Sequence, residues 1–280
     1  MEARSVGIVG VGLIGGSIAL AALRAGDRVY LYDRFAPREL AGPKFRPAIV
    51  VDDLEELVSH SRLIVLATPI AALAKIGAVL GELVSAGQVV SDVASVKEPV
   101  TKTLAKALRN RCDYVPAHPM AGSEKSGAQA ARVDLFAGAV TLVCPELASD
   151  MASVELVKCF WEKLGTRVVL ASVEAHDQMV AAMSHLPHLL AALLVKHVAA
   201  EKNAALELSG PGFRDSTRIA SGAPELWADI LLSNSDAVQQ HLLAFKKLLE
   251  EAGILLAEKD AKKLQALLDE AKQNRDRLSP

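Results

Sequence analysis

The pattern of hydrophobic and polar positions changes near residue 172. Before that point, short runs rich in β-branched residues alternate with Ala- and Leu-rich stretches. Such alternation, with nearly continuous apolar strands, predicts a parallel sheet covered by helices on both faces. The expected strands cover residues 5–10, 28–33, 62–67, 88–92, 113–117, 139–144 and 166–171.

From residue 172 onward, the strand pattern disappears and helical periodicity takes its place. Helices are expected over residues 173–205, around 224–251 and over 258–276. The last of these places leucines on one face and charges on the other. We therefore predict an α/β domain over residues 1–171, followed by an all-helical domain over residues 172–280.

The segment GIVGVGLIGGS places Gly10, Gly12 and Gly15 in GxGxxG spacing, directly after a strand and at the start of a helix. Glycines at this spacing allow a tight turn and a close approach of the backbone to a pyrophosphate at the helix N-terminus. The pattern predicts that residues 1–171 form a Rossmann-type dinucleotide-binding domain. Leu13 and Ile14, inside the same segment, are expected beside the cofactor.

The next strand ends in Asp33, where a carboxylate accepts hydrogen bonds from the ribose hydroxyls. Asp33 favours NAD because a carboxylate repels a 2′-phosphate. Arg34 follows immediately and would grip that phosphate if Asp33 turned away, so NADP stays an alternative. Thr68 follows the third strand and either lines the cofactor edge or forms an ordinary strand-to-helix turn.

Two polar segments follow the fourth and fifth expected strands, SDVASVKEPV and VPAHPMAGSEKSG. Ligands of such sheets bind beyond the carboxyl ends of the strands, so Ser95 and His118 are expected to face the nicotinamide. Histidine suits the removal of a hydroxyl proton because its ordinary pKa lies near neutrality. The alternatives are a structural loop histidine at 118 and a serine at 95 that caps the next helix.

The helical half carries a second group of polar residues. His176 and Asp177 precede His185 and His188, which would share a helix face unless Pro187 interrupts it. That pair is a candidate metal site, although no third ligand with matching spacing is evident. Further on, GPGFRDSTRIA offers Arg214 and Arg218, either of which would clamp a substrate carboxylate.

Composition narrows the class of protein further. The net charge of −2 and the interspersed charges exclude the basic stripe of a nucleic-acid binder. The three cysteines form no CxxC pair, which favours free thiols in a reducing compartment without zinc or disulfides. We expect a cytoplasmic protein, because the first strand pattern begins too early for a signal peptide.

One apolar stretch, residues 179–200, has the length of a membrane span. It contains His185, His188 and Lys196, which are costly in lipid, so we interpret it as a helix buried in protein and expect no membrane partner. A stretch this apolar exceeds what one small helical domain covers. We therefore predict a homodimer through the helical half.

Taken together, the motifs resemble the prephenate/arogenate (cyclohexadienyl) dehydrogenase family. The matching stretches occur in family order and span most of the chain: GVGLIGGS, SDVASVK, AHPMAGSEKSG, AHDQMVAAMSHLPH, GFRDSTRIA and PELWADI. The resemblance implies a Rossmann domain before a helical dimerisation domain, with the active site between them. It also implies NAD(P)-dependent oxidative decarboxylation of prephenate or arogenate on the route to tyrosine.

The resemblance also implies roles for individual residues. His118 corresponds to the catalytic residue that contacts the ring hydroxyl, and Ser95 to a serine that bonds the same hydroxyl. Arg218 corresponds to the arginine that binds a substrate carboxylate, and His188 to a residue lining the pocket rather than a metal ligand. Trp227 either reaches the partner's site or packs in the core, and the expected supporting network consists of Glu124, His176 and Asp177. No metal is implied.

Two other functions remain as alternatives to this reading. A β-hydroxyacid-type dehydrogenase also joins a Rossmann domain to helices but uses a catalytic lysine, for which Lys196 and Lys202 are available, although neither lies in a recognisable motif. A non-catalytic dinucleotide sensor would need the glycine segment but neither His118 nor Arg218.

Overall fold

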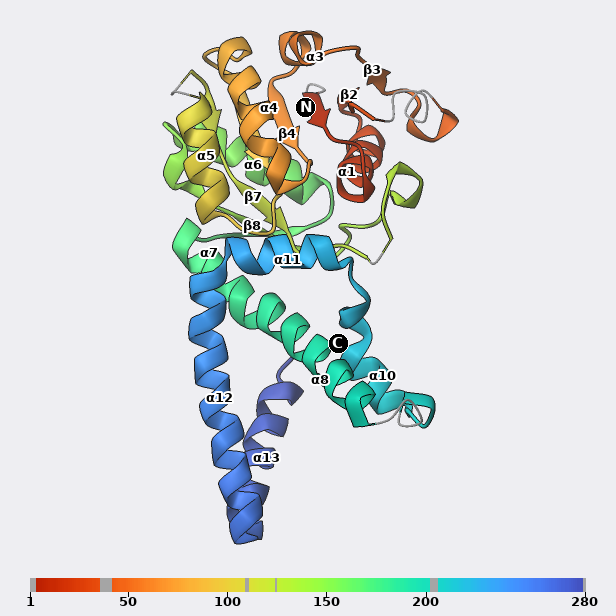
Figure 1. Ribbon diagram of the computed structural model, residues 1–280. Helices are drawn as coiled ribbons and strands as arrows, with labels where there is room; N and C mark the ends of the chain where they lie inside the picture. Colours follow the sequence, from red (N-terminus) through yellow and green to blue (C-terminus); the bar gives the residue numbers. More distant parts are fainter. Residues whose placement is uncertain (1–3, 36–41, 109–110, 124, 202–205, 279–280) are drawn as a thin grey trace. The chain divides into compact units, whose positions relative to one another are not determined.

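The computed structural model describes residues 4–35, 42–108, 111–123, 125–201 and 206–278 (Figure 1). It divides into two compact units, Met1–Asn234 and Ser235–Pro280. This division by packing differs from the predicted domains 1–171 and 172–280, because the first helices after residue 172 pack with the α/β half. The predicted domain boundary stays a prediction.

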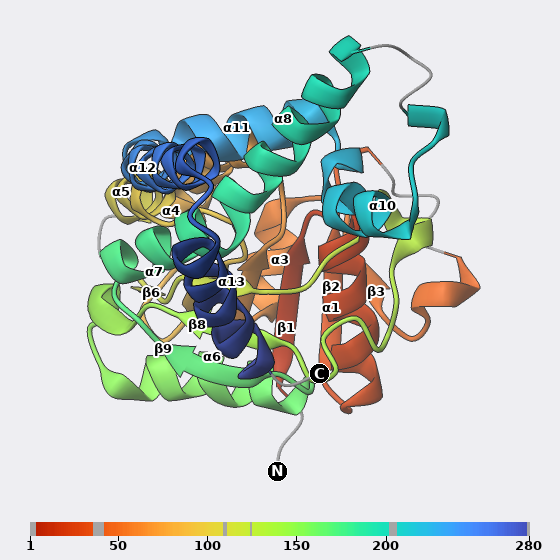
Figure 2. The same ribbon diagram turned by 90° about the horizontal axis from the view of Figure 1, so that it is seen from below.

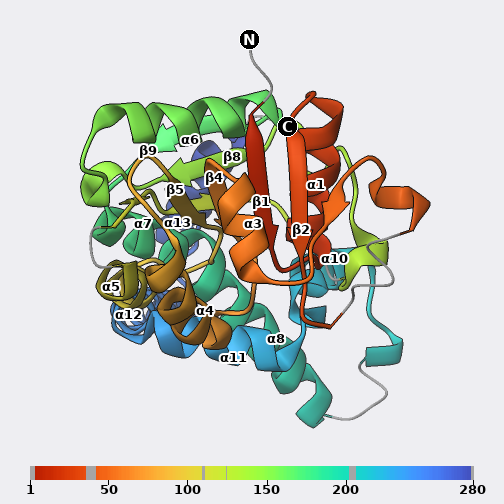
Figure 3. The same cartoon turned by 90° about the horizontal axis from the view of Figure 1, so that it is seen from above.

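Six parallel strands form the main sheet of the first unit, and its central strands are labelled in Figure 3. Their order is β3 (Ile49–Val50), β2 (Arg28–Tyr32), β1 (Ser5–Val9), β4 (Leu63–Leu66), β5 (Val89–Asp92) and β6 (Asp113–Tyr114). The predicted parallel sheet is confirmed. Strand β3 was not predicted, because a two-residue strand leaves no periodic pattern.

Helices cover both faces of this sheet. Alternate residues of β4 show why, since Leu63 and Val65 join one buried cluster while Ile64 and Leu66 join the other. Helices α1 (Leu13–Arg24) and α6 (Met151–Lys163) supply the first cluster. Helices α3 (Leu54–His60), α4 (Ile70–Leu83) and α5 (Glu98–Leu108) supply the second, on the opposite face (Figure 3).

The prediction of one strand over residues 113–117 is wrong. After β6 the chain leaves the parallel sheet, and β7 (Ala117–Pro119) pairs antiparallel with β8 (Val140–Val143), which pairs parallel with β9 (Arg167–Leu170). Pro116 has no N–H to continue the parallel ladder, and its carbonyl accepts from Cys144 N at 2.9 Å in the second sheet. Figure 2 shows β8 and β9 beside α6.

The helical part of the first unit consists of one long helix with a π-helical turn, followed by shorter elements. Helix α7 (Val173–Val180) passes through a π-helical turn, Ala181–His185, into α8 (Leu186–Glu201). The predicted helix from residue 173 is therefore present without a break, and its one irregularity is this π-helical turn ahead of Pro187, which supplies no N–H to the first turn of α8. Helix α10 (Pro211–Thr217), a 3₁₀ turn (Arg218–Ser221) and α11 (Pro224–Ser233) follow. Other 3₁₀ turns lie at Pro43–Phe45, Ala128–Ala130 and Pro145–Leu147.

The apolar stretch of α7 and α8 is only partly buried within the single chain. Val173–Ala200 has the length and composition of a membrane-crossing helix, and 33% of its most apolar window is buried in the single chain. Met183, Leu193 and Leu194 are exposed. The single chain therefore covers only part of this helix, and burial of the rest depends on the predicted homodimer.

The second unit consists of α12 (Ser235–Glu258) and α13 (Ala261–Asp276). The helix predicted to end near residue 251 continues to Glu258, where Lys259 adopts a positive φ of 53° and stops it. Asp260 caps α13 by accepting from Lys263 N at 3.0 Å. Several leucines of this unit are exposed, Leu243, Leu249 and Leu268 among them.

Candidate active site

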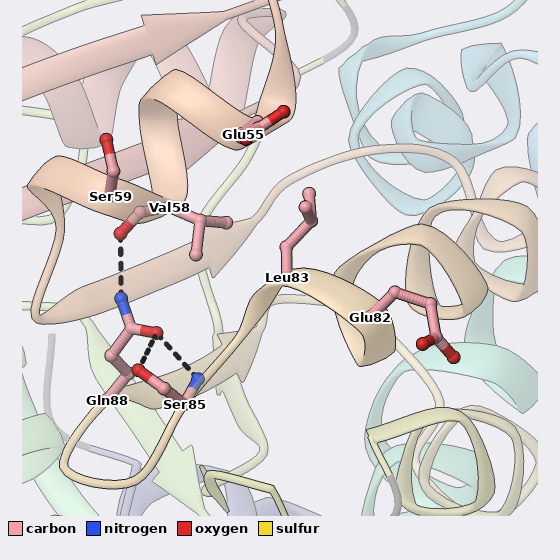
Figure 4. A pocket seen from close by; sticks show the side chains of 7 residues that line it. All are labelled: Glu55, Val58, Ser59, Glu82, Leu83, Ser85 and Gln88. Atoms are coloured by element: carbon pink, nitrogen blue, oxygen red, sulfur yellow. Dashed lines mark hydrogen bonds between the residues drawn. The ribbon is translucent and has the colours of Figure 1, made fainter.

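A pocket of about 410 Å³ lies between α3 and the end of α4, lined in part by Glu55, Ser59, Glu82 and Gln88 (Figure 4). Gln88, which also lines the pocket, donates from Nε2 to Val58 O at 2.7 Å. Its lining residues come just before β4 and β5 in the sequence, so the pocket lies at the amino ends of these strands. Ligands of parallel sheets bind at the carboxyl ends. We therefore place the candidate site at the other edge.

At the carboxyl end of β1, the glycine segment forms the tight turn that a dinucleotide requires. Gly10 has a φ of +90°, and a Cβ on Gly15 would lie 1.9 Å from Gly10 O, so both positions exclude side chains. Gly12 caps α1 without a side-chain hydrogen bond, and open space surrounds the position of its missing Cβ. Leu13 and Ile14 form the half-buried first turn of α1. These residues fit a pyrophosphate at the helix N-terminus.

Asp33 follows β2 and is held in a fixed orientation. Its Oδ2 accepts from Val11 N at 2.7 Å, and its Oδ1 accepts from Phe35 N at 2.8 Å. The carboxylate therefore lies against the glycine turn, where the ribose hydroxyls of a dinucleotide bind. Arg34 is exposed, and its guanidinium lies 5.3 Å from the ring centroid of Phe35.

Thr68 lies at the carboxyl end of β4, against the same turn. A Cβ on Gly10 would meet Thr68 Cγ2 at 2.6 Å, so the two residues are neighbours. The hydroxyl of Thr68 is buried and has no hydrogen-bond partner within the described residues. A buried unpaired hydroxyl is costly, and a polar ligand beside it would satisfy it.

The catalytic candidates form a chain of hydrogen bonds through three side chains. His118 Nδ1 lies 2.8 Å from His176 Nε2, and His176 Nδ1 lies 2.7 Å from Asp177 Oδ1. His118 comes from β7, whereas His176 and Asp177 come from α7. His118 therefore lies inside a strand, paired with Leu142, rather than in the loop that the sequence suggested.

The charge on Asp177 determines where the protons lie in this chain. A carboxylate only accepts, so His176 carries its proton on Nδ1 and accepts at Nε2. His118 must then donate from Nδ1, which leaves the lone pair of its Nε2 available as a base. Burial opposes ionisation of Asp177, but hydrogen bonds from His176 and from the Glu98 and Lys97 amides lower its pKa below the usual value.

Both histidines of this hydrogen-bonded chain, His118 and His176, are held neutral. Burial, together with the nearby His176, Lys97 and His185, lowers the pKa of His118 well below its ordinary value. Burial also lowers the pKa of His176, although the hydrogen bond to Asp177 opposes that shift. At neutral pH, His118 is therefore in the form that accepts a proton.

Asp177 also caps a helix in the α/β half. Its Oδ1 accepts from Lys97 N and its Oδ2 from Glu98 N, each at 2.8 Å, at the start of α5. The carboxylate lies at the positive end of that helix, which stabilises its charge. The alternative that Ser95 caps α5 is not observed, because these two amides bind Asp177.

A buried ion pair holds the segment that carries Ser95. Asp92 and Lys97 are fully buried, and Lys97 Nζ lies 2.5 Å from Asp92 Oδ1. Asp92 also accepts hydrogen bonds from Tyr114 Oη at 2.7 Å and from Ala94 N at 2.9 Å. Burial and the charge of Asp92 raise the pKa of Tyr114 well above its ordinary value, so it remains a donor. Ser95 lies half-buried between these anchors.

His188 of α8 stacks on Trp227 of α11 within the same chain. Their ring centroids are 3.5 Å apart and the planes differ by 12°. His188 Nδ1 is buried without a hydrogen-bond partner in the described part of the chain. Gly222 permits the stack, since a Cβ there would lie 2.3 Å from Trp227 Nε1 and 3.1 Å from His188 Cε1.

The remaining predicted site residues are exposed or lie outside the described residues. Arg218 is exposed in the 3₁₀ turn that packs against α8, and no ion pair of it occurs among the described residues. Arg214 is also exposed, with Nε 3.5 Å from Ser209 Oγ. Glu124 lies outside the described residues.

Sequence reasoning missed Asn234 and did not assign His185 to the network. Asn234 Nδ2 lies 2.8 Å from Asp177 O and 3.2 Å from His185 Nδ1. No local pattern marks an asparagine at a helix end as a partner of residues 49 and 57 positions earlier. Across the described ranges, no group of three or more His, Cys, Asp or Glu is arranged to hold a metal.

A glycine turn at the end of β1, a fixed acid after β2 and a neutral histidine backed by a carboxylate define a dinucleotide-dependent dehydrogenase. The family comparisons are more specific. Residues 18–170 match the nucleotide-binding domain of prephenate dehydrogenase, and residues 172–270 match its dimerization domain. The chain belongs to the prephenate dehydrogenase family.

Individual relatives agree with this assignment. Cyclohexadienyl dehydrogenase of Zymomonas mobilis is 33% identical over 89% of this chain and 88% of its own length. The structure of A. aeolicus prephenate dehydrogenase with hydroxyphenyl propionate and NAD+ has a TM-score of 0.90, at 29% identity, over 100% of this chain and 99% of that one. Synechocystis arogenate dehydrogenase has a TM-score of 0.87, at 28% identity, over 99% and 100%.

Proposed function

We propose that the protein catalyses the NAD-dependent oxidative decarboxylation of prephenate to 4-hydroxyphenylpyruvate in tyrosine biosynthesis. The observation that carries this proposal is the chain His118–His176–Asp177, which leaves one imidazole nitrogen as a base. Family membership supplies the substrate class. Arogenate, converted to tyrosine, is the second candidate substrate, because a relative of similar fold is an arogenate dehydrogenase.

In this mechanism, His118 Nε2 accepts the proton of the ring hydroxyl. NAD, when bound, would supply the hydride acceptor for the carbon that bears this hydroxyl. As the proton arrives, positive charge on His118 is stabilised by the hydrogen bond to His176 and, beyond it, by the Asp177 carboxylate. The ring carboxylate then leaves as CO₂, the electron pair of the broken bond restores aromaticity, and the resulting phenolate takes its proton back from His118.

Substrate orientation falls to residues around His118. We assign to Ser95 a hydrogen bond to the ring hydroxyl, because its segment is held by Asp92 next to the capped start of α5. His188 has a buried Nδ1 that needs a polar partner, and Trp227 fixes its ring plane. Arg218 would bind a substrate carboxylate from the 3₁₀ turn, and Glu124 would belong to the supporting network.

The cofactor is held by the glycine segment, Asp33 and Thr68. We favour NAD over NADP because both Asp33 oxygens accept backbone N–H groups. Turning the carboxylate away, as a 2′-phosphate bound to Arg34 requires, would break both hydrogen bonds. The expected kinetic result is a higher kcat/KM with NAD than with NADP.

We further propose a homodimer formed through the helical half. The matched dimerization domain and the exposed apolar residues of α8 and α12 support it. A monomeric mass at micromolar concentration would contradict it. We place the protein in the cytoplasm, since Cys112, Cys144 and Cys159 are free thiols. Burial raises the pKa of Cys112 to about 11 and of Cys144 to about 12, so both remain unreactive.

The test measures reduced-cofactor formation by the purified protein, with prephenate and arogenate each combined with NAD and NADP. The variant His118→Asn is expected to keep its NAD affinity while kcat falls by about 10²–10⁴. Near-normal turnover of this variant would remove His118 from the mechanism. Binding of NAD without turnover in all four combinations would favour a non-catalytic dinucleotide sensor.

A further inference from the structure

Asn234 contacts both the backbone of Asp177 and the ring of His185 through one amide nitrogen. The residue follows α11 and is 7% exposed. Its Nδ2 lies 2.8 Å from the backbone carbonyl of Asp177. A carbonyl oxygen only accepts, so the atom facing it must be the amide nitrogen. The second hydrogen of that nitrogen is then directed at His185 Nδ1, 3.2 Å away.

This contact determines the tautomer of His185. An Nδ1 that accepts a hydrogen bond carries a lone pair, so neutral His185 holds its proton on Nε2. Protonation of Nδ1 would place two donors against each other and break the contact with Asn234. The amide therefore disfavours both the other tautomer and the imidazolium form.

His185 lies among the groups that carry the proposed chemistry. It is 1% exposed, in the π-helical turn, with the edge of its ring toward Trp227 at a centroid distance of 6.4 Å. His176 and Asp177 act on it electrostatically from α7, and His188 does so from α8.

Its charge also affects the proposed base. His118, on β7, interacts electrostatically with His185 and with Lys97, and both interactions lower the pKa of His118. Burial, the largest effect, lowers the pKa of His185 to about 4.

An imidazolium at His185 would weaken His118 as a base, because the two histidines interact electrostatically. We propose that Asn234 is a positioning residue of the active site, which donates to His185 Nδ1, holds His185 in the tautomer protonated on Nε2, and adds to the effect of burial in disfavouring its imidazolium form. The inference rests on the proposed function, and it extends that function to Asn234, which lies outside the motifs, and to His185, to which the resemblance assigned no role.

The tautomer is tested in the intact protein without substrate. Histidine labelled with ¹⁵N gives separate signals for protonated and unprotonated ring nitrogens, and His185→Gln assigns the signal by its loss. The expected result is an unprotonated Nδ1 and a protonated Nε2 at neutral pH. A protonated Nδ1 on His185 in the unsubstituted protein would overturn the inference, whatever the activity.

The functional consequence is tested with Asn234→Asp and Asn234→Ala. A carboxylate at 234 would accept from His185 Nδ1, invert the tautomer and favour the imidazolium. We expect the acid limb of the kcat profile of Asn234→Asp to move up by about one pH unit. We expect a smaller upward shift for Asn234→Ala, which no longer opposes protonation of His185. Unchanged pH profiles in both folded variants would overturn the inference.

Gln88→Ala is the matched control for lost stability. Gln88 also donates from one amide nitrogen to two groups, the carbonyls of Val58 and Ser61, but at the opposite edge of the sheet. This variant should lose stability without any shift in the pH profile. An equal shift in Gln88→Ala would show that the effect of Asn234 is structural. Failure of the proposed function is seen separately, as absence of turnover in the unsubstituted protein.

Discussion

Replacement of Asp177 by asparagine keeps the shape of the side chain and removes its charge. The carboxylate accepts three hydrogen bonds, from His176 Nδ1 at 2.7 Å and from the amides of Lys97 and Glu98 at 2.8 Å. An amide has one accepting oxygen, so its nitrogen must face one of these donors. The exposed start of α5 at Glu98 is the least costly place for it, because water then satisfies the Glu98 amide.

In that orientation, the tautomers of His176 and His118 are retained while the charge behind them is lost. A hydrogen bond to a charged group contributes about 1.5–3 kcal/mol, against about 1 kcal/mol for a neutral one. The difference of roughly 0.5–2 kcal/mol applies to the imidazolium that forms in the transition state. Because 1.36 kcal/mol equals a factor of ten in rate, kcat should fall by about 2- to 30-fold.

If the amide nitrogen instead faced His176, the proton order of the whole chain would invert. His176 would then donate from Nε2, and His118 would carry its proton on Nε2 and lose its function as a base. The fall in kcat would approach about 10⁴, the loss expected when a catalytic imidazole takes the wrong tautomer. The two orientations therefore differ by orders of magnitude in the same assay.

The assay is the initial rate of reduced-cofactor formation at saturating substrate, with KM measured in parallel. Asp113→Asn is the matched control, since Asp113 also accepts three hydrogen bonds, from Ser149 N, Ser149 Oγ and Ser153 Oγ, away from the site. It should lose stability with unchanged kcat. A folded Asp177→Asn protein with the kcat of the unsubstituted protein would refute the role assigned to the carboxylate.

Two further outcomes follow from the same geometry. Gly222→Ala should raise KM for the ring substrate, with a smaller effect on kcat. The added Cβ would lie 2.3 Å from Trp227 Nε1 and would displace the indole from His188. An unchanged KM in steady-state kinetics would contradict this prediction. The free energy of unfolding should fall as pH drops below about 6.5, the ordinary pKa of histidine. In the folded protein the pKa values of His118, His176 and His185 lie below this value. The unfolded chain therefore binds more protons than the folded protein as the pH falls. Urea titrations at pH 7.5 and roughly pH 5 measure this, and equal stability at both values would show that these histidines are not buried neutral.

Much of the fold and part of the site could be predicted from the sequence because they depend on local requirements. Gly10 and Gly15 are needed where the backbone turns tightly, and Asp33 follows the next strand at a fixed spacing. Buried strands and amphipathic helices leave periodic patterns, so the α/β and all-α halves were recognisable. The departures occur where the pattern is short or interrupted, at the two-residue β3, at Pro116 and at the π-helical turn before Pro187.

The sequence by itself determined which residue types were present for the chemistry, since His118, His176 and Asp177 each lie in a distinctive motif. Only the tertiary structure decided that these residues form one hydrogen-bonded chain, and that Asp177 caps α5, 79 positions away. It also decided that Asn234 contacts His185. Hydrogen bonds between distant segments depend on how helices and strands pack, and packing leaves no periodic signal in the residues that it brings together.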